Sequence, residues 1–294
     1  MPLIAVQNLR REYRRGVPVL DGVTFAMEQG EVVGLLGRNG AGKTTLLRIL
    51  MGMIQSQGGE VRLFGMEPRV QPVEIKKRTG FVAEDQVFPP HLRIGDLIEF
   101  HQALFPNWDA AMEQELMERF RLRRAAKMPE LSKGEARQVA LICAVCHKPE
   151  LLILDEPAGG LDPVARREFL ETSIQLLNRE GTTILFSSHH MADVERIASR
   201  VVLLHEGKVF LDSPLDELRE NVCIAMVPIA AGRVEQLARL PGCLRARQNG
   251  NSIHGVFRGP VDGVSHQIGT ELGIAPPQCR NVPLEDLFIE IAGR

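Results

Sequence analysis

The strongest constraint on this sequence is the nonapeptide GRNGAGKTT at Gly37–Thr45. It fits the pattern G-x-x-x-x-G-K-[ST], in which backbone N–H groups surround phosphate oxygens and the lysine reaches the outer phosphates. The apolar run VVGLL precedes it and the helix-like LLRILMGM follows it. We therefore predict a strand, a phosphate-binding loop and a helix whose N-terminus faces the same oxygens. Lys43 is expected to bind the β- and γ-phosphates, and Thr44 a Mg²⁺ ion.

A second strand ends in two carboxylates, in the segment LLILDEP at Leu151–Pro157. Ligands of open α/β sheets bind at the carboxyl ends of such buried strands. Asp155 is expected to hold the Mg²⁺ shell, and Glu156 to face the γ-phosphate and orient or polarise the attacking water. An Asp-Glu pair alone is more often a solvated strand end, but its combination with a phosphate loop favours catalysis. ATP and Mg²⁺ are thus the predicted cofactors.

The order of apolar segments predicts an α/β fold with a mostly parallel sheet covered on both faces. TTILFSS at Thr182–Ser188 and RVVLLHEG at Arg200–Gly207 are further buried strands of this kind. Short, partly alternating segments from Ile4 to Leu36 predict an N-terminal antiparallel β-lobe. Apolar residues at helical spacing over residues 88–148 predict a helical insertion.

The tail of the chain has a different character, with short strand and helix candidates after Asn221. Asn249-Gly250 is a good hairpin turn within it. We predict one large domain at 1–221 and a small α+β accessory domain at 222–294.

Composition limits the partners that the chain is expected to have. A formal net charge of -2 gives no electrostatic case for nucleic-acid binding, so none is expected. The longest apolar run, Val139–Cys146, is far shorter than the ~18 residues that span a bilayer, so no membrane pathway is expected within this chain. The start lacks the pattern of a secretory signal, and five scattered cysteines favour a reducing, cytosolic compartment.

Two further motifs have alternative interpretations. LSKGEARQVAL at Leu131–Leu141 places a good N-cap, Ser132, before a helix, and Gly134 leaves backbone N–H groups uncovered. This indicates a second anion-binding helix start, although for the string alone an ordinary capped helix is the more common interpretation. Cys143–His147 spells C-x-x-C-H, a haem-attachment pattern, but it falls on an apolar helix, where buried cysteines are the better interpretation.

Together these motifs resemble the nucleotide-binding subunit of an ABC transporter, over about residues 3–220. LSKGE looks like the family signature LSGGQ, and GGLD at 159–162 looks like its D-loop. His189 matches the switch histidine, and Tyr13 sits where the family stacks an aromatic ring on adenine. The resemblance implies a P-loop ATPase with these residues: ATP contacts from Tyr13, Gly37, Asn39, Gly40, Ala41, Gly42, Lys43, Thr44 and Thr45; catalytic Glu156 and His189; Mg²⁺ ligands Thr44, Asp155 and Glu84; signature residues Ser132, Lys133, Gly134 and Glu135; and Asp162 of the D-loop.

The same resemblance implies partners. In this family two ATPase domains pack head to tail, so that Ser132 and Gly134 of one would contact the γ-phosphate held by the other. The second subunit would be an identical copy or a close paralogue. A membrane permease would contact the helical insertion, especially around residues 88–100, and hold the protein at the cytoplasmic face of the cell membrane.

The sequence departs from the family pattern at three positions. Glu84 stands where the Q-loop glutamine is expected, with Gln86 two residues further on, and either could take that role. Lys133 and Glu135 replace the usual glycine and glutamine of the signature.

The segments GFVAED and FPPHLRIGDLIEF, with the closing LEDLFIEIAG, resemble the exporter branch that has separate permease subunits. The alternatives are a non-transport ABC ATPase acting on DNA or ribosomes, and a small-molecule kinase. The first would carry long coiled-coil or zinc insertions or a second ATPase domain, and the second has no need of LSKGE, GGLD and His189 in order.

Overall fold

The computed structural model describes residues 1–161, 166–167, 169–172, 181–231, 234–281 and 283–292. The chain forms two compact units, Met1–Asp212 and Ser213–Arg294. The division comes before helix α8 (Leu215–Asn221), whereas the sequence placed it after that helix. Leu215 and Leu218 of α8 are buried, and α8 contacts β10 of the second unit, which explains the earlier boundary.

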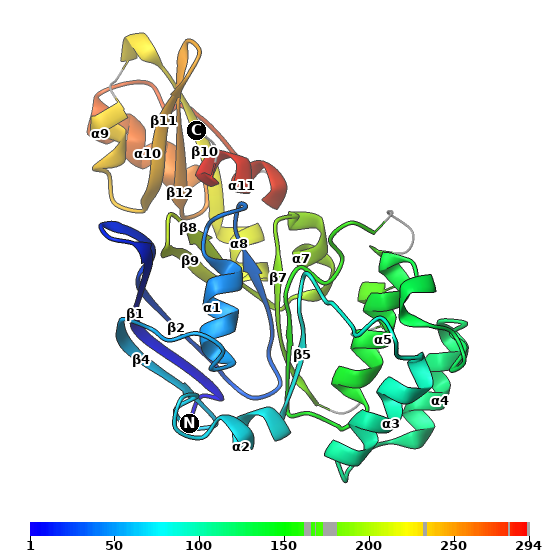
Figure 1. Ribbon diagram of the computed structural model, residues 1–294. Helices are drawn as coiled ribbons and strands as arrows, with labels where there is room; N and C mark the ends of the chain where they lie inside the picture. The colour runs from blue at the N-terminus through cyan, green and yellow to red at the C-terminus, as the bar shows by residue number, and fades with distance from the viewer. Residues whose placement is uncertain (162–165, 168, 173–180, 232–233, 282, 293–294) are drawn as a thin grey trace. The chain divides into compact units, whose positions relative to one another are not determined.

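A six-stranded sheet forms the centre of the first unit, as Figure 1 shows. The pairings from β5 through β6, β7 and β3 to β8 are all parallel, which confirms the predicted mostly parallel sheet. Every residue of β6 and β7 is buried, as expected for strands covered on both faces. In sheet order the strands are β5 (Thr79–Val82), β6 (Leu151–Leu154), β7 (Thr183–Ser188), β3 (Val32–Leu36), β8 (Arg200–His205) and β9 (Lys208–Pro214).

The N-terminal lobe is a three-stranded antiparallel sheet in the order β2-β1-β4. Its buried residues, such as Leu9 and Leu20, share one hydrophobic core with Leu46 and Leu47 of helix α1 and with Leu35 of β3. The phosphate loop, between β3 and α1, is therefore anchored on both sides. The elements are β1 (Ile4–Arg14), β2 (Val17–Met27), β4 (Gly58–Leu63) and α1 (Lys43–Leu50), followed by α2 (Pro72–Lys77) before the central sheet resumes.

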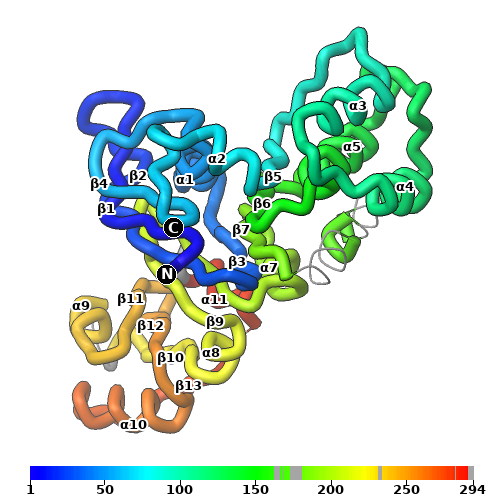
Figure 2. Tube along the Cα trace, turned by 90° about the horizontal axis from the view of Figure 1, so that it is seen from below, coloured from blue at the N-terminus to red at the C-terminus, as the bar shows by residue number. Residues whose placement is uncertain are grey.

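The helical insertion lies between β5 and β6 and stands apart from the β-lobe in Figure 2. Its α5 packs on β5, and both α3 and α4 pack on α5. Cys143 and Cys146 are buried at the end of α5, where burial raises the pKa of Cys143 to about 12. The helices are α3 (Ile94–Leu104), α4 (Ala110–Arg119), a 3₁₀ turn (Met128–Glu130) and α5 (Lys133–Val145). Beyond the insertion, α7 (Met191–Ile197) contacts β3 and β7.

The second unit is an antiparallel sheet in the order β11-β12-β10-β13, with the β-α-β-β-α-β succession of ferredoxin-like domains. Cys223, Ala225 and Phe257 pack with Leu237 of α9 and Ile268 of α10. The hairpin predicted at Asn249-Gly250 joins β11 to β12. The elements are β10 (Val222–Pro228), a 3₁₀ turn (Ile229–Ala231), α9 (Val234–Ala238), β11 (Cys243–Asn249), β12 (Ser252–Arg258), α10 (Val261–Leu272), β13 (Gln278–Asn281) and α11 (Leu284–Ala292). Across the described part of both units, we find no helix with the length and apolarity of a membrane span.

Candidate ATP-binding site

The phosphate loop needs glycine at specific positions. Gly40 (φ 83°) and Gly42 (φ 104°) both have left-handed backbones, which residues with a Cβ rarely adopt. A Cβ on Gly42 would lie 2.7 Å from the carbonyl oxygen of Val19, and one on Gly37 would lie 2.7 Å from that of Leu204. Among the described residues, nothing beyond its chain neighbours lies within 4 Å of the Cβ position of Gly40, so this part of the loop faces open space.

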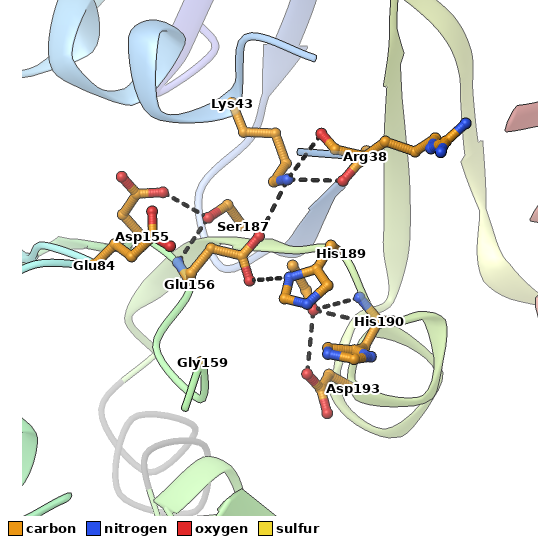
Figure 3. Close-up of polar contacts among 12 residues, drawn as sticks. Arg38, Lys43, Glu84, Asp155, Glu156, Gly159, Ser187, His189, His190 and Asp193 are labelled. Carbon is orange, nitrogen blue, oxygen red and sulfur yellow. Dashed lines mark hydrogen bonds and ion pairs between the residues drawn. The ribbon is translucent and has the colours of Figure 1, made fainter. Parts of the chain in front are cut away.

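Lys43 of the loop points towards Glu156, which follows β6 together with Asp155 (Figure 3). Buried Lys43 donates a hydrogen bond to the carbonyl oxygen of Gly37 at 2.7 Å, and its Nζ lies 3.1 Å from Glu156 Oε1. Thr44 Oγ1 donates to Asp155 Oδ1 at 3.2 Å. Burial raises the pKa of Asp155, while hydrogen bonds from Ser187 and Thr44 lower it. Two of the three predicted Mg²⁺ ligands, Thr44 and Asp155, are therefore in contact.

Glu156 is the most constrained residue of the site. Its φ of 45° places a residue with a Cβ in the left-handed region, as happens at functional positions that the surroundings hold in place. Its carboxylate contacts Lys43 through Oε1, and Oε2 lies 2.8 Å from His189 Nδ1. Oε1 accepts no well-oriented hydrogen bond from the described residues, despite the nearby ammonium. In this structure the ion pair with Lys43 is therefore the contact that Oε1 makes.

Ser187 was not predicted from the sequence. Its hydroxyl donates to Asp155 Oδ1 at 2.8 Å and accepts the backbone N–H of Glu156 at 2.7 Å. Ser187 lies on β7, the parallel neighbour of β6, so it holds the Asp155 carboxylate and the Glu156 backbone at the carboxyl ends of these strands. The only signal in the sequence was its position at the end of the apolar strand TTILFSS.

A cleft of about 410 Å³ joins the phosphate loop to Glu84 and Glu156. Gln86, the other candidate for the Q-loop role, instead lines two neighbouring clefts. Burial raises the pKa of Glu84, and the charges of Asp155 and Glu156 raise it further. The cleft is lined by Val19, Asn39, Gly40, Gly42, Lys43, Thr44, Thr45, Glu84 and Glu156.

These residues fit Mg-ATP. Among the described residues, no group of three or more His, Cys, Asp or Glu side chains could hold a metal. Mg²⁺ normally needs only one or two carboxylates beside phosphate oxygens and water, and Thr44 with Asp155 supplies oxygen ligands of that kind. The bound ion would neutralise charge on the phosphates, and here it would also offset the mutual repulsion of Glu84, Asp155 and Glu156.

Tyr13 lies beside the start of α1, with its hydroxyl 3.4 Å from Thr45 Oγ1. The Arg11 guanidinium carbon lies 4.8 Å from the centroid of the Tyr13 ring. The side chain is 56% exposed, which leaves ring surface for an adenine.

The signature segment forms a capping box at the start of α5. Ser132 Oγ accepts the N–H of Glu135 at 3.2 Å, and Glu135 Oε2 accepts the N–H of Ser132 at 2.8 Å. These hydrogen bonds lower the pKa of Glu135. Lys133 lines a second cleft of about 420 Å³ with Glu84 and His189, and not the cleft of the phosphate loop. Asp162 lies outside the described residues.

Comparison with known proteins decides the family. A family model described as "ABC transporter" matches residues 20–159. The ABC transporter ATP-binding protein YtrB of Bacillus subtilis (strain 168) is 33% identical over 206 residues, which cover 70% of each chain. This chain belongs to the ABC transporter ATP-binding proteins.

Two further likenesses extend this assignment. An uncharacterized ABC transporter ATP-binding protein of Synechocystis sp. (strain ATCC 27184 / PCC 6803 / Kazusa) is 31% identical over 306 aligned residues, covering 98% of this chain and 84% of its own. The solved structure of the ATP-binding subunit of an ABC transporter superposes with a TM-score of 0.66 at 30% identity, over 74% of this chain and 92% of that one. The chain is therefore an ABC-type ATPase, and ATP hydrolysis coupled to transport is its activity.

In this ABC ATPase an apolar groove of about 680 Å³ runs between the helical insertion and the central sheet. Phe88, Phe100 and Phe105 line it from the insertion side, and Met51 and Phe81 from the other. Val87, at its edge, is 84% exposed. Phe100 is 58% exposed, so two large apolar side chains at this groove lie open to solvent, as happens where a partner binds.

Proposed function

We propose that this ABC ATPase drives export of a substrate through a separate membrane permease, and that two copies close head to tail around Mg-ATP. The observation that carries the proposal is the cluster of Lys43, Glu156 and His189 in front of the phosphate loop. It supplies a cation for the outer phosphates, a carboxylate to orient water and an imidazole that holds that carboxylate. Tyr13 would stack on the adenine, and Glu84 would take the Q-loop position.

Closure of two copies is supported by the signature segment. The N-terminus of α5, capped by Ser132, has the uncovered N–H groups and partial positive charge that bind an anion. Ser132, Lys133 and Gly134 would contact the γ-phosphate held by the partner copy, and Asp162 would link the two sites. In the capping box the carboxylate of Glu135 accepts the backbone N–H of Ser132. Glu135 would therefore stabilise the start of its own helix.

ATP-dependent dimerisation tests this arrangement directly. In Glu156→Gln, hydrolysis should be slow and the sandwiched nucleotide should persist, so sedimentation should show a dimer with Mg-ATP and a monomer with Mg-ADP. Adding Lys43→Met to this variant should abolish the dimer. A Glu156→Gln chain that stays monomeric at saturating Mg-ATP, with and without its permease, would contradict the proposal.

The groove beside the insertion is the proposed permease contact. Val87 and Phe100 are exposed at it, and a helix of the permease with two or three apolar side chains would cover them. Val87→Glu with Phe100→Glu should abolish copurification of a polytopic membrane protein while leaving ATP hydrolysis by the free subunit within about twofold of the unmodified protein. Retention of the membrane protein by that variant would place the permease elsewhere.

The proposal has three further parts. The direction of transport is export, the protein lies at the inner face of the cell membrane, and it has no nucleic-acid partner. The exporter segments around GFVAED and the net charge of -2 support them. Inside-out vesicles that contain the assembled transporter should accumulate the substrate when ATP is added outside. Stimulation of ATP hydrolysis by DNA or ribosomes in place of a permease would favour the non-transport alternative.

A further inference from the structure

Arg137 is a buried cation beside the site to which the proposed function gives no role. It lies on α5, is 9% exposed, and donates hydrogen bonds to two backbone carbonyls. One is the carbonyl of Gly159, and the other is that of Glu84, at 3.1 Å. These carbonyls belong to the loops that follow β6 and β5. Arg137 therefore joins the signature helix to both loops that carry acidic residues of the site.

The contact with Gly159 bears on the geometry of Glu156. The N–H of Gly159 donates to the carbonyl oxygen of Glu156 at 2.9 Å, so the chain turns back between these residues. The left-handed backbone of Glu156 persists only where the surroundings hold it. On the β7 side, the hydroxyl of Ser187 accepts the backbone N–H of Glu156. The turn to Gly159 holds it from the other side, and Arg137 fixes the carbonyl that ends this turn.

The second contact fixes the loop of Glu84 in the same way. Burial lowers the pKa of Arg137, while the negative charges of Glu84, Asp85 and Glu156 raise it. A guanidinium stays charged on burial, and its rigid fork of N–H donors can serve two carbonyls in different directions. An ammonium would keep the charge but is a point donor on a flexible stem. The two hydrogen bonds thus depend on the rigid fork of donors, which arginine has and lysine lacks.

We propose that Arg137 is a positioning residue for ATP hydrolysis, which holds the Glu156 turn and the Glu84 loop in a fixed relation to the signature helix. Arg137 lines the second cleft, with Glu84 and His189, but is not among the described residues that line the cleft with Lys43 and Thr44. Its proposed action on a nucleotide at the phosphate loop is therefore through these two loops and not by direct contact. The inference rests on the proposed nucleotide site and adds to it a residue that sets the rate.

The test compares Arg137→Met and Arg137→Lys in the full-length chain. For both variants kcat for Mg-ATP should fall about tenfold to a hundredfold, because small displacements of a catalytic group have effects of that size. KM, and the affinity for a fluorescent ATP analogue measured in the Glu156→Gln background, should stay within about threefold. Arg123→Met, at an exposed position of the insertion, is the matched control and should leave kcat unchanged.

Two results would overturn the proposal. The first is a normal kcat in Arg137→Lys, because charge alone would then suffice. The second is recovery of kcat when Glu84→Gln is added to Arg137→Met, because Arg137 would then be only a counter-charge. Thermal unfolding checks that each variant is folded, and Arg137→Lys decides the matter if Arg137→Met is not. Lys43→Met in the same assay tests the nucleotide site separately from the role of Arg137. Normal hydrolysis by that variant would reject the nucleotide site itself.

Discussion

Two buried glutamates show how the nucleotide cleft differs from the helical insertion. Glu113, in the insertion, accepts hydrogen bonds from Gln102, Trp108 and Arg124 and uses both carboxylate oxygens. Glu156, in the cleft, has one oxygen 2.8 Å from His189 Nδ1 and the other 3.1 Å from Lys43 Nζ. A buried acid whose partners belong to the helical insertion stabilises the fold. A buried acid whose partners are the lysine and histidine beside the phosphate loop is placed to act on a ligand there.

The largest expected effect separates these two glutamates. Glu156→Gln should reduce kcat for ATP by about a hundredfold or more, since it removes the carboxylate that orients water, while the free energy of unfolding changes little. Glu113→Gln should do the reverse. It should lower the free energy of unfolding by about 2 kcal/mol, through loss of a hydrogen-bonded charge pair, and keep kcat within about twofold. ATPase assays and urea unfolding of both variants measure these effects. Equal loss of activity in both variants would contradict the assignment of different roles to the two glutamates.

The second comparison is between a buried histidine, His147, and an exposed one, His91. His147 is buried at the end of α5 against the ring of Phe105, with ring centroids 4.2 Å apart. Burial lowers its pKa from 6.5 to about 4. Between these values the unfolded chain binds a proton that the folded chain does not, so stability is complete above about pH 6.5 and falls as the pH decreases towards 4.

The expected loss over that range is up to about 3 kcal/mol. His147→Gln should remove most of this pH dependence, and His91→Gln, at an exposed position, should leave it in place. Urea unfolding at a series of pH values between 4 and 7.5 measures it. A pH profile that is the same with and without His147 would show that other groups are responsible.

The sequence predicted the local parts of the site and missed the parts made by neighbouring strands. The phosphate loop and LLILDEP each lie on one continuous segment, so these motifs predicted Lys43 and Glu156, and the structure brings the two side chains within 3.1 Å of each other. Ser187 reaches Glu156 only because β7 is the parallel neighbour of β6, and a single sequence does not record that pairing. Arg137 was hidden for the same reason, since its acceptors lie in two distant loops.

The fold shows the same division. Apolar runs predicted the parallel sheet, because strands buried on both faces have continuous hydrophobic sequences. The boundary between the two units fell earlier than expected, since the polar residues of α8 gave no sign that this helix contacts β10 of the second unit. The sequence left the Q-loop role open between Glu84 and Gln86. In the structure Glu84 lines the cleft of the phosphate loop and Gln86 lines the neighbouring clefts, which supports the proposal for Glu84.

The third comparison concerns two aromatic residues. Trp108, in the insertion, is partly buried and donates its indole N–H to Glu113 at 2.9 Å. Tyr13 is mostly exposed. Tyr13→Ala should raise the KM for ATP by about tenfold, because stacking contributes about 1 kcal/mol beside the buried area, while Tyr13→Phe should cost little. Trp108→Phe should leave KM unchanged and lower stability instead. An unchanged KM in Tyr13→Ala would show that the adenine binds elsewhere.

The smallest expected effect belongs to Arg11, whose guanidinium lies against the Tyr13 ring. Arg11 also donates to the carbonyl of Gln55 at 3.2 Å, so it links β1 to the segment after α1 and limits the directions in which the ring can face. A cation–π contact at an exposed site contributes about 0.5–1 kcal/mol. Arg11→Met should therefore raise the KM for ATP by about twofold to fivefold, and only when Tyr13 is present. In Tyr13→Ala the same change should have no further effect, because there is no ring to hold; an equal effect in both backgrounds would mean that Arg11 acts on the nucleotide by its charge alone.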